Sequence, residues 1–423
     1  MCAWHRVALI LCCTVAAAAE PDDAKAQDRS TLIWDYRLPD GGRQSAAQVV
    51  DGALLPDGSM LLAMADAGDV TFRAYRVSVT GEVIWRTDAL GDAPRDPGFP
   101  RPVLAPAPSS EGGTRAIDAG GFVVVANGSS YWRIPLANAR LLAALPNEAP
   151  FVRLTSTAVA PDGSVWAGGG EKDLAFGSPT RNTEPCSRAV VAHYDDHDRM
   201  LWQWRFDGDA LATHPWRIIP LSGGEVLVLI STKIPPGSGP MGAELQYCIE
   251  QGPDRSWLVW LDAAGRLSDL VGLGTDEIAD IGRLSDGRLV VAGIVRSPSG
   301  ERPFFLRILS PRGRTALVDR DHLLSELPPF KDAAQRSHRN SLWWNEAVDK
   351  LFLANDRIFA TLSFVCAQNA CDVDESRLVE FNDEGEVVNW SAPWQGPPPI
   401  AVLPDGTGFI RAADDSVRRF SFP

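Results

Sequence analysis

Apolar and polar residues alternate with a period of two along most of the chain, in short runs separated by turn residues. The first unit shows the pattern most clearly, with apolar runs over residues 48–54, 60–65, 72–79 and 83–88. Alternation of this period is typical of half-buried β-strands, and the Gly and Asp between the runs favour tight turns. The pattern therefore predicts a sheet of four antiparallel strands.

The four-stranded unit recurs along the chain. A Pro-Asp-Gly or Ser-Asp-Gly turn stands between two apolar runs at Asp57, Asp162, Asp286 and Asp405. The whole unit fits five further stretches, which cover residues 115–146, 155–206, 217–273, 278–318 and 350–390. Self-similarity at this spacing indicates a repeat architecture such as a solenoid or a propeller.

The C-terminal stretch has only three strand-like runs, over residues 400–403, 407–411 and 416–422. Residues 31–38 supply the missing fourth strand, and Trp34 is placed in it as Trp85, Trp202 and Trp390 are placed in theirs. Joining the two ends of the chain in one sheet closes a ring and removes exposed sheet edges. The sequence thus predicts an all-β, seven-bladed β-propeller of four-stranded antiparallel blades, closed by an N-terminal strand that completes the C-terminal blade.

A turn glycine followed by an aliphatic–Trp pair recurs in these units, and this pattern resembles the repeats of pyrroloquinoline-quinone-type and related propellers of the bacterial secreted kind. The resemblance covers nearly all of the mature chain and implies the architecture alone, because no specific family within that group is identified and no cofactor can be named. The recurrent tryptophans are expected to pack between blades and not to line a cofactor site.

Residues 1–19 have the features of a secretory signal peptide. Arg6 precedes an apolar stretch over residues 7–15, and four alanines end at Ala19, near which cleavage is expected. The stretch is shorter than the roughly 20 residues of a membrane span. A lipoprotein is the alternative, although Leu11 stands where a small residue is wanted. We expect a secreted or periplasmic protein with no transmembrane segment, a flexible segment over 20–30 and one propeller domain over 31–423.

The formal net charge is −14. A nucleic-acid partner requires a basic face, so the charge argues against one. The expected partner is a small polar ligand or a cell-envelope or extracellular protein, and the protein is expected to be a monomer.

Four cysteines follow the signal segment, at Cys186, Cys248, Cys366 and Cys371. An even number in an oxidising compartment suggests disulfides, for which three pairings are possible. The favoured pairing joins Cys366 to Cys371, which share one loop, and Cys186 to Cys248, which lie in equivalent loops of neighbouring repeats. A metal site built from these thiols is the alternative, but the paired spacing of zinc sites is absent.

The long connections are predicted to gather at one end of the propeller. They include residues 91–114, 171–188, 233–255, 366–376 and an insertion over 320–349. Long loops in compact domains tend to be functional, although stapled loops can also serve to resist proteolysis. In the insertion, residues 321–327 have helical spacing of their leucines and could form a partial lid, with Leu342-Trp343-Trp344 anchoring it or facing a ligand.

Residues just before each innermost strand are expected to ring the mouth of the central channel. Gln48, Thr155, Asn345 and Glu346 belong to this rim. The candidate ligand-binding residues are His214, Trp216, Arg217, Asp276, Glu277, His338 and Arg339. A base, acids, a cation and an aromatic in one place suit a polar ligand, and also an ordinary hydrated rim.

The sequence leaves open whether the protein is an enzyme. A lyase or hydrolase at the channel mouth would use His214 or His338 as general base and Asp276 or Glu277 as metal ligand or orienting group. No nucleophile elbow, metalloprotease motif or phosphate loop is present. His193 and His197 straddle a hairpin, and Asp195-Asp196-His197-Asp198 is interpreted as a solvated turn in preference to a calcium site. Catalytic residues stay unknown and no metal is predicted, so binding through the loop-rich end is the favoured function.

Overall fold

The protein is described here from a computed structural model. The structure describes residues 31–36, 48–55, 57–66, 71–88, 103–106, 122–127, 130–135, 143–144, 153–160, 162–172, 187–206, 213–232, 255–295, 303–330, 344–366, 375–391, 393, 401–402, 407–411 and 417–421.

Five four-stranded antiparallel sheets have described side chains on at least three of their strands, and each is built from strands consecutive in sequence. Their strands are β2 (Gln48–Leu54), β3 (Met60–Asp66), β4 (Thr71–Val77) and β5 (Val83–Arg86); β10 (Arg153–Val159), β11 (Val165–Lys172), β12 (Ser187–Tyr194) and β13 (Met200–Arg205); β14 (His214–Pro220), β15 (Val226–Ser231), β16 (Ser256–Leu261) and β17 (Leu267–Gly274); β18 (Glu277–Arg283), β19 (Leu289–Ile294), β20 (Phe304–Leu309) and β21 (Ala316–His322); and β22 (Trp344–Ala354), β23 (Arg357–Cys366), β24 (Glu375–Phe381) and β25 (Val387–Trp390).

Two further sheets are described mainly through their backbone pairing. One contains β6 (Val103–Pro106), β7 (Phe122–Asn127), β8 (Ser130–Pro135) and β9 (Ala143–Ala144). The other has the order β1-β28-β27-β26 and joins β1 (Thr31–Tyr36) to β26 (Ala401–Val402), β27 (Thr407–Arg411) and β28 (Val417–Ser421). In that sheet β1 is antiparallel to β28, with Thr31 opposite Ser421 and Tyr36 opposite Val417.

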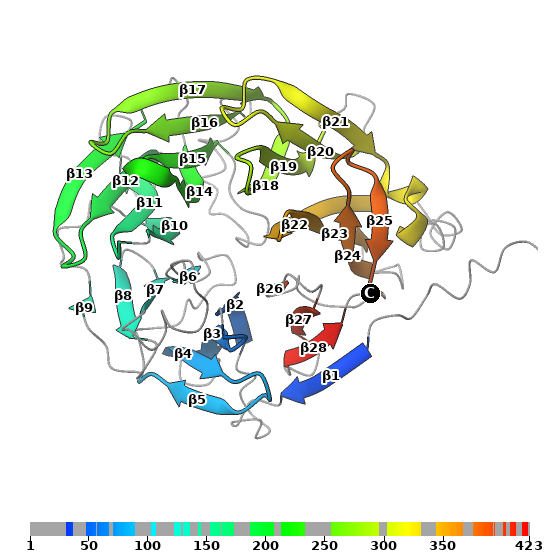
Figure 1. Cartoon of the computed structure of the whole chain (residues 1–423), viewed down its shortest axis with the longest axis horizontal. Helices are drawn as coiled ribbons and strands as arrows, with labels where there is room; N and C mark the ends of the chain where they lie inside the picture. Colours follow the sequence, from blue (N-terminus) through cyan, green and yellow to red (C-terminus); the bar gives the residue numbers. More distant parts are fainter. Residues whose placement is uncertain are drawn as a thin grey trace, which may run out of the picture.

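The sheets stand around a common centre, with the first strand of each consecutive sheet innermost and its fourth strand at the rim (Figure 1). Neighbouring innermost strands contact one another, and β26 contacts both β2 and β22. The predicted all-β propeller of four-stranded antiparallel blades is confirmed. Five of these blades have side chains described on at least three strands.

The burial of each strand follows from its place between two neighbouring blades. Every residue of β15 and of β19 is buried, because both faces of these strands are covered. The outermost strands alternate instead, as β5 does with half-buried and exposed residues in turn. The continuous apolar run in the middle strands and the alternation at the rim are therefore two consequences of one arrangement.

The predicted Asp-Gly turns form the hairpins between the first and second strands. Gly58, Gly163 and Gly287 adopt φ values of 79°, 85° and 91°, which glycine reaches without steric penalty. In each turn the aspartate accepts a backbone hydrogen bond from the second residue after it, as Asp162 does from Ser164 at 2.9 Å. The fourth predicted turn, at Asp405, lies outside the described residues.

The tryptophans of the outermost strands pack against the next blade, as the sequence predicts. Trp202 on β13 donates from Nε1 to the carbonyl oxygen of Ala263 at 3.0 Å. Its ring lies over Gly265 so closely that a Cβ at this glycine would come within 2.5 Å of the indole. Trp390 packs against the core shared by the β18–β21 and β22–β25 blades. The side chain of Trp34 lies outside the described part.

The second predicted repeat is wrong in its first strand. The sequence placed that repeat at residues 115–146, with residues 91–114 as a connection, but the innermost strand β6 lies at Val103–Pro106. The strand has only four residues and ends in proline, which normally counts against a strand. An innermost strand is a sheet edge, where the missing N–H of proline is tolerated.

The insertion predicted at 320–349 is mostly not an insertion. Asp321 and His322 belong to β21, β22 already begins at Trp344, and the predicted helix over 321–327 is replaced by two 3-10 turns, η3 (Leu324–Glu326) and η4 (Pro328–Phe330). The spacing of these leucines reflects their burial, because Leu324, Leu327 and Phe330 pack in the core between two blades. The described part of this segment therefore does not form a lid. None of the described helices is long and apolar enough to cross a membrane.

The contact of Trp202 with Gly265 can be separated from backbone strain by two glycine substitutions. Gly265→Ala places a methyl group against the indole at a φ of +77°, whereas Gly223→Ala at +78° meets nothing within 4 Å. We expect Gly223→Ala to cost ~1 kcal/mol of unfolding free energy and Gly265→Ala at least ~1 kcal/mol more. Urea unfolding of both variants measures the difference, and equal losses would contradict the packing described here.

Candidate functional site

The long connections leave the propeller from hydrogen-bonded stems. The hydroxyl of Ser256 donates to Ser231 at 3.2 Å, and the backbone N–H of Thr232 donates to the carbonyl of Arg255 at 3.0 Å. The hydroxyls of Ser363 and Ser376 are 2.9 Å apart in the equivalent place. All four serines are buried, so the loop bases are fixed to the sheets.

These stems lie at the end of the sheets opposite the short Asp-Gly turns. In the β10–β13 blade, Val165 pairs with Tyr194 beside the turns, and Lys172 pairs with Ser187 at the far end. The connections over 173–186, 233–254 and 367–374 therefore depart from the same end of their blades. This end, which we call the loop end, is the candidate functional surface.

The innermost strands share a β-bulge at the same level. The register shifts at one residue in each of β2, β10, β14, β18 and β22, which makes the extra residues Val50, Thr155, Trp216, Ala279 and Asp349. Two of these side chains reach the next blade. Thr155 donates to the carbonyl of Pro215 at 2.5 Å, and Trp216 donates to the carbonyl of Ala279 at 2.8 Å.

The predicted rim residues are therefore inside strands and not in front of them. Thr155 and Trp216 connect neighbouring blades, and a bulge is what turns each side chain toward the next backbone. Gln48 opens β2, while Asn345 and Glu346 lie within β22. Among the candidates that the structure describes, Asp276 alone precedes its strand, which begins at Glu277.

Arg217 meets a carboxylate that the sequence did not single out. Asp280 is 5 % exposed and accepts hydrogen bonds from the N–H of Ile281 at 2.8 Å and of Leu351 at 3.1 Å. The Nε of Arg217 lies 3.7 Å from its carboxylate. Asp280 thus connects three innermost strands, and the half-exposed guanidinium of Arg217 is the group of this cluster that solvent reaches.

Asp276 belongs to a second cluster of charged side chains. Its carboxylate accepts from Arg307 at 2.8 Å, and the same guanidinium donates to Asp319 at 2.8 Å and lies over the ring of Phe305. Burial raises the pKa of nearby Asp321, and the carboxylates of Asp319 and Asp276 add to this against the pull of Arg307. The cluster holds more acids than bases and connects β20, β21 and the start of β18.

The other candidate residues that the structure describes occupy different surroundings. His214 is only 9 % exposed and pairs with Ser231 across β14 and β15. Glu277 is half-buried at the start of β18. His338 and Arg339 lie outside the described residues, as do Cys186, Cys248 and Cys371; Cys366 ends β23, and its side chain is not described.

Arg133 of the neighbouring blade forms hydrogen bonds to the hairpin of residues 195–198, which the sequence predicts as a solvated turn. This buried arginine of β8 donates to the carboxylate of Asp198 at 2.6 Å and to the carbonyls of Gly163 and Asp195 at 2.7 Å each. Asp198 has a φ of 61° where the corresponding hairpins have Gly81, Gly265 and Gly385. Its salt bridge to Arg133 offsets the cost of this backbone conformation.

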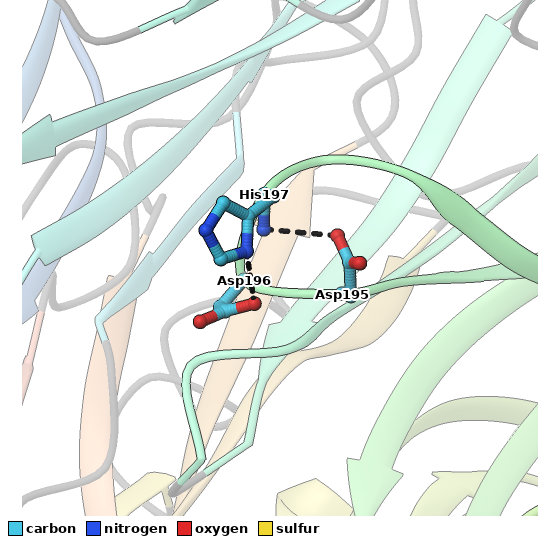
Figure 2. Close-up of side chains that lie close together, drawn as sticks. All are labelled: Asp195, Asp196 and His197. Carbon is cyan, nitrogen blue, oxygen red and sulfur yellow. Dashed lines mark hydrogen bonds and ion pairs between the residues drawn. The ribbon is translucent and has the colours of Figure 1, made fainter.

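The tip of that hairpin gathers three groups that could bind a metal ion (Figure 2). Their ligand atoms lie within 4.8 Å of one another, but Asp195 already accepts the N–H groups of Arg199 and His197 and the guanidinium of Arg199. The backbone bond from Arg199 is the main reason that the pKa of Asp195 falls to about 2. The imidazole of His197 lies 2.6 Å from the carboxylate of Asp196, and both side chains are exposed, so the geometry matches the predicted solvated turn.

His193 occupies an apolar site between two tryptophans. Its ring stacks on Trp166 at a centroid distance of 4.3 Å and lies 5.3 Å from Trp202. Neither ring nitrogen has a hydrogen-bond partner, and the residue is 8 % exposed. Burial lowers the pKa of His193, although the carboxylates of Asp162 and Asp195 act in the opposite direction.

Sequence reasoning missed Asp280, Arg307 and Arg133. The available signal was a charge inside an apolar strand, as in Phe304-Phe305-Leu306-Arg307-Ile308-Leu309. A charge in such a position has to find a partner, because burying it unpaired is costly. The partners of Asp280 and Arg133 come from other blades and cannot be read from the local pattern. Arg307 instead binds Asp276 and Asp319 of its own blade.

Solved structures of other proteins share the fold. Hydrazine synthase of Kuenenia stuttgartiensis is 10 % identical with a TM-score of 0.52, and the match covers 90 % of this chain and 98 % of that one. The β-propeller domain of Cps50 (Swd1) of Myceliophteria thermophila is 11 % identical with a TM-score of 0.53, covering 93 % and 100 %. At this identity the likeness shows the fold alone. No protein-family model and no curated protein matches the sequence.

The buried imidazole predicts a loss of stability in acid. Because the pKa of His193 is lower in the folded than in the unfolded chain, the unfolded chain takes up a proton first as pH falls. Stability is therefore present above about pH 6.5 and is lost as pH falls through the folded pKa. Urea midpoints at about pH 7.5 and 5.5 measure this loss, which His193→Phe should reduce. A loss that is unchanged in His193→Phe and reduced in the exposed His197→Asn would contradict it.

Proposed function

We propose that the chain is an exported, monomeric propeller of seven blades whose loop end binds a small polar ligand or a cell-envelope or extracellular protein. The observation that carries the binding proposal is the common origin of the long connections. Three of them rise from the same end of their blades, on stems fixed by buried hydroxyl and backbone hydrogen bonds. Loops on rigid stems lose less conformational entropy on binding than free segments do.

Two sheets beyond the five blades support a ring of seven. The β6–β9 sheet stands between the β2–β5 and β10–β13 blades, and β26 contacts β2 on one side and β22 on the other. The pairing of β1 with β28 supports closure by the N-terminal strand. A ring fixed in this way would hold the loop end in one shape.

Export and the disulfides belong to the same proposal. The features of residues 1–19 favour cleavage near Ala19, and pairing of Cys186 with Cys248 and of Cys366 with Cys371 would join the loops at this end. The enzymatic alternative gains no support, since His214 is buried and Asp276 is bound to Arg307.

Closure by β1 can be tested by two N-terminal truncations. A chain that begins at residue 31 keeps the β1–β28 pairing, and one that begins at residue 37 loses it. We expect the first to unfold like the full-length mature chain, because it lacks only the segment before β1. The second should unfold at a clearly lower urea concentration, because β28 becomes an open edge. Equal midpoints would contradict closure.

Binding at the loop end can be tested by shortening one loop on its stem. Joining Thr232 to Arg255 through a short Gly-Ser linker keeps the stem hydrogen bonds and removes residues 233–254. A panel of sugars, amino acids and dicarboxylates is screened by thermal shift on the unaltered chain. A ligand at about 100 times its Kd should add ~2.7 kcal/mol. We expect this gain to disappear in the shortened variant, and a gain of equal size there would count against the loop end.

A further inference from the structure

The outermost strands carry every large, exposed hydrophobic side chain among the described residues, apart from Val79 in a neighbouring turn. A second bulge recurs in these strands just after the hairpin, and its extra residues are Ile84, Leu201, Ser268, Leu317 and Val388. The four aliphatic ones are 49 % to 56 % exposed. A bulge turns a side chain out of the regular alternation, so these positions point away from the cores.

Two exposed leucines of β17 pair with residues of a core that tryptophans of β13 also contact. Leu267 and Leu270 are 50 % and 44 % exposed and pair with Leu261 and Val259. Leu261 and Val259 belong to the cluster against which half-buried Trp202 and Trp204 of β13 pack. The four residues Trp202, Trp204, Leu267 and Leu270 therefore share one joint between blades, and we call them the rim patch.

Two arginines flank the rim patch and project their charge outward. Arg266 directly precedes Leu267 and is 80 % exposed, whereas its partner Asp262 is 27 % exposed. Arg314 is 66 % exposed and binds Asp269 of β17, which is 15 % exposed. In both ion pairs the guanidinium is more exposed than the carboxylate, so it is the charged group that an incoming side chain would meet first.

These arginines are also held in place before any partner arrives. Asp262 accepts the N–H groups of Ala264 and Arg266 on one oxygen and the guanidinium on the other. The backbone bond from Arg266 is the main reason that the pKa of Asp262 falls, so the ion pair persists in mild acid. A cation fixed in advance loses less side-chain entropy on binding, and Trp with Arg is the composition typical of binding hot spots.

We propose that the rim patch is a docking site for an extended segment of a partner protein that combines aliphatic and acidic side chains. Aliphatic side chains would cover Leu267, Leu270 and the tryptophan edges, and carboxylates would meet Arg266 and Arg314. The outer edge of β17 offers backbone groups to the same segment, since within the described residues β17 pairs only with β16. This surface is separate from the loop end and does not depend on the function proposed there.

The test uses the full chain and a phage library of random peptides of about 12 residues. The peptides selected on the unaltered protein should be enriched in Asp and Glu together with Leu, Ile or Val. Synthetic fluorescent copies of them should lose about tenfold or more in affinity for Leu267→Ser/Leu270→Ser and for Arg266→Gln. The matched control is Leu317→Ser/Val388→Ser, which removes equally exposed aliphatic residues elsewhere on the rim and should leave the affinity unchanged.

Several outcomes would overturn the proposal. One is that the selected peptides bind all variants with equal affinity, and another is that they are not enriched in acidic residues. Sedimentation of the unaltered chain could instead reveal a dimer that Leu267→Ser/Leu270→Ser dissociates, which would make the occupant a second copy. Flotation with vesicles of phosphatidylglycerol, lost in the same variant, would make it a lipid surface. Urea unfolding of each variant shows that a loss of binding is not a loss of fold.

Discussion

The gap between neighbouring sheets widens from the centre of the propeller to its rim, and the side chains follow this gradient. Near the centre there is little room: a Cβ at Gly168 would lie 2.8 Å from Ile218 of the next blade, and one at Gly282 would collide with Leu353. At the rim the gap is filled by Trp202 and Trp204. Every other feature described above depends on filling this wedge, because a blade of four strands buries its two faces only against its neighbours.

Polar contacts between blades are shaped by the same constraint. Where the sheets are close, single side chains on a bulge or beside one reach the next backbone, as Thr155, Trp216 and Asp280 do. Farther out, where the sheets diverge, the longer side chain of Arg133 spans the gap to two turns at once. The charged residues that suggest a catalytic rim in the sequence are thus partly used to hold the ring of blades, which leaves the loops and the rim as the surfaces free for binding.

The parts of the fold that could be predicted from the sequence are those governed by neighbouring residues. The strand of residues 48–54, the turn glycines at Gly58 and Gly163 and the packing role of Trp202 depend on period, turn chemistry and residue size. The predictions that failed concern features that depend on how distant parts of the chain are assembled. The short strand ending in Pro106 is permitted by its edge position, and Leu324 and Leu327 are buried against a neighbouring blade instead of forming an α-helix. Leu351 lies 71 residues from Asp280 and Asp276 lies 31 residues from Arg307, beyond any local pattern.

Asp198 restricts how the repeats of this chain can be rearranged. In the corresponding hairpins a glycine makes the turn without help, so those blades can be exchanged or duplicated as independent modules. The β10–β13 blade differs, because Asp198 of its turn pairs with Arg133, a buried arginine of the preceding β6–β9 sheet. The two blades form a pair whose sequences must alter together, and a graft or circular rearrangement that parts them would leave a buried cation behind.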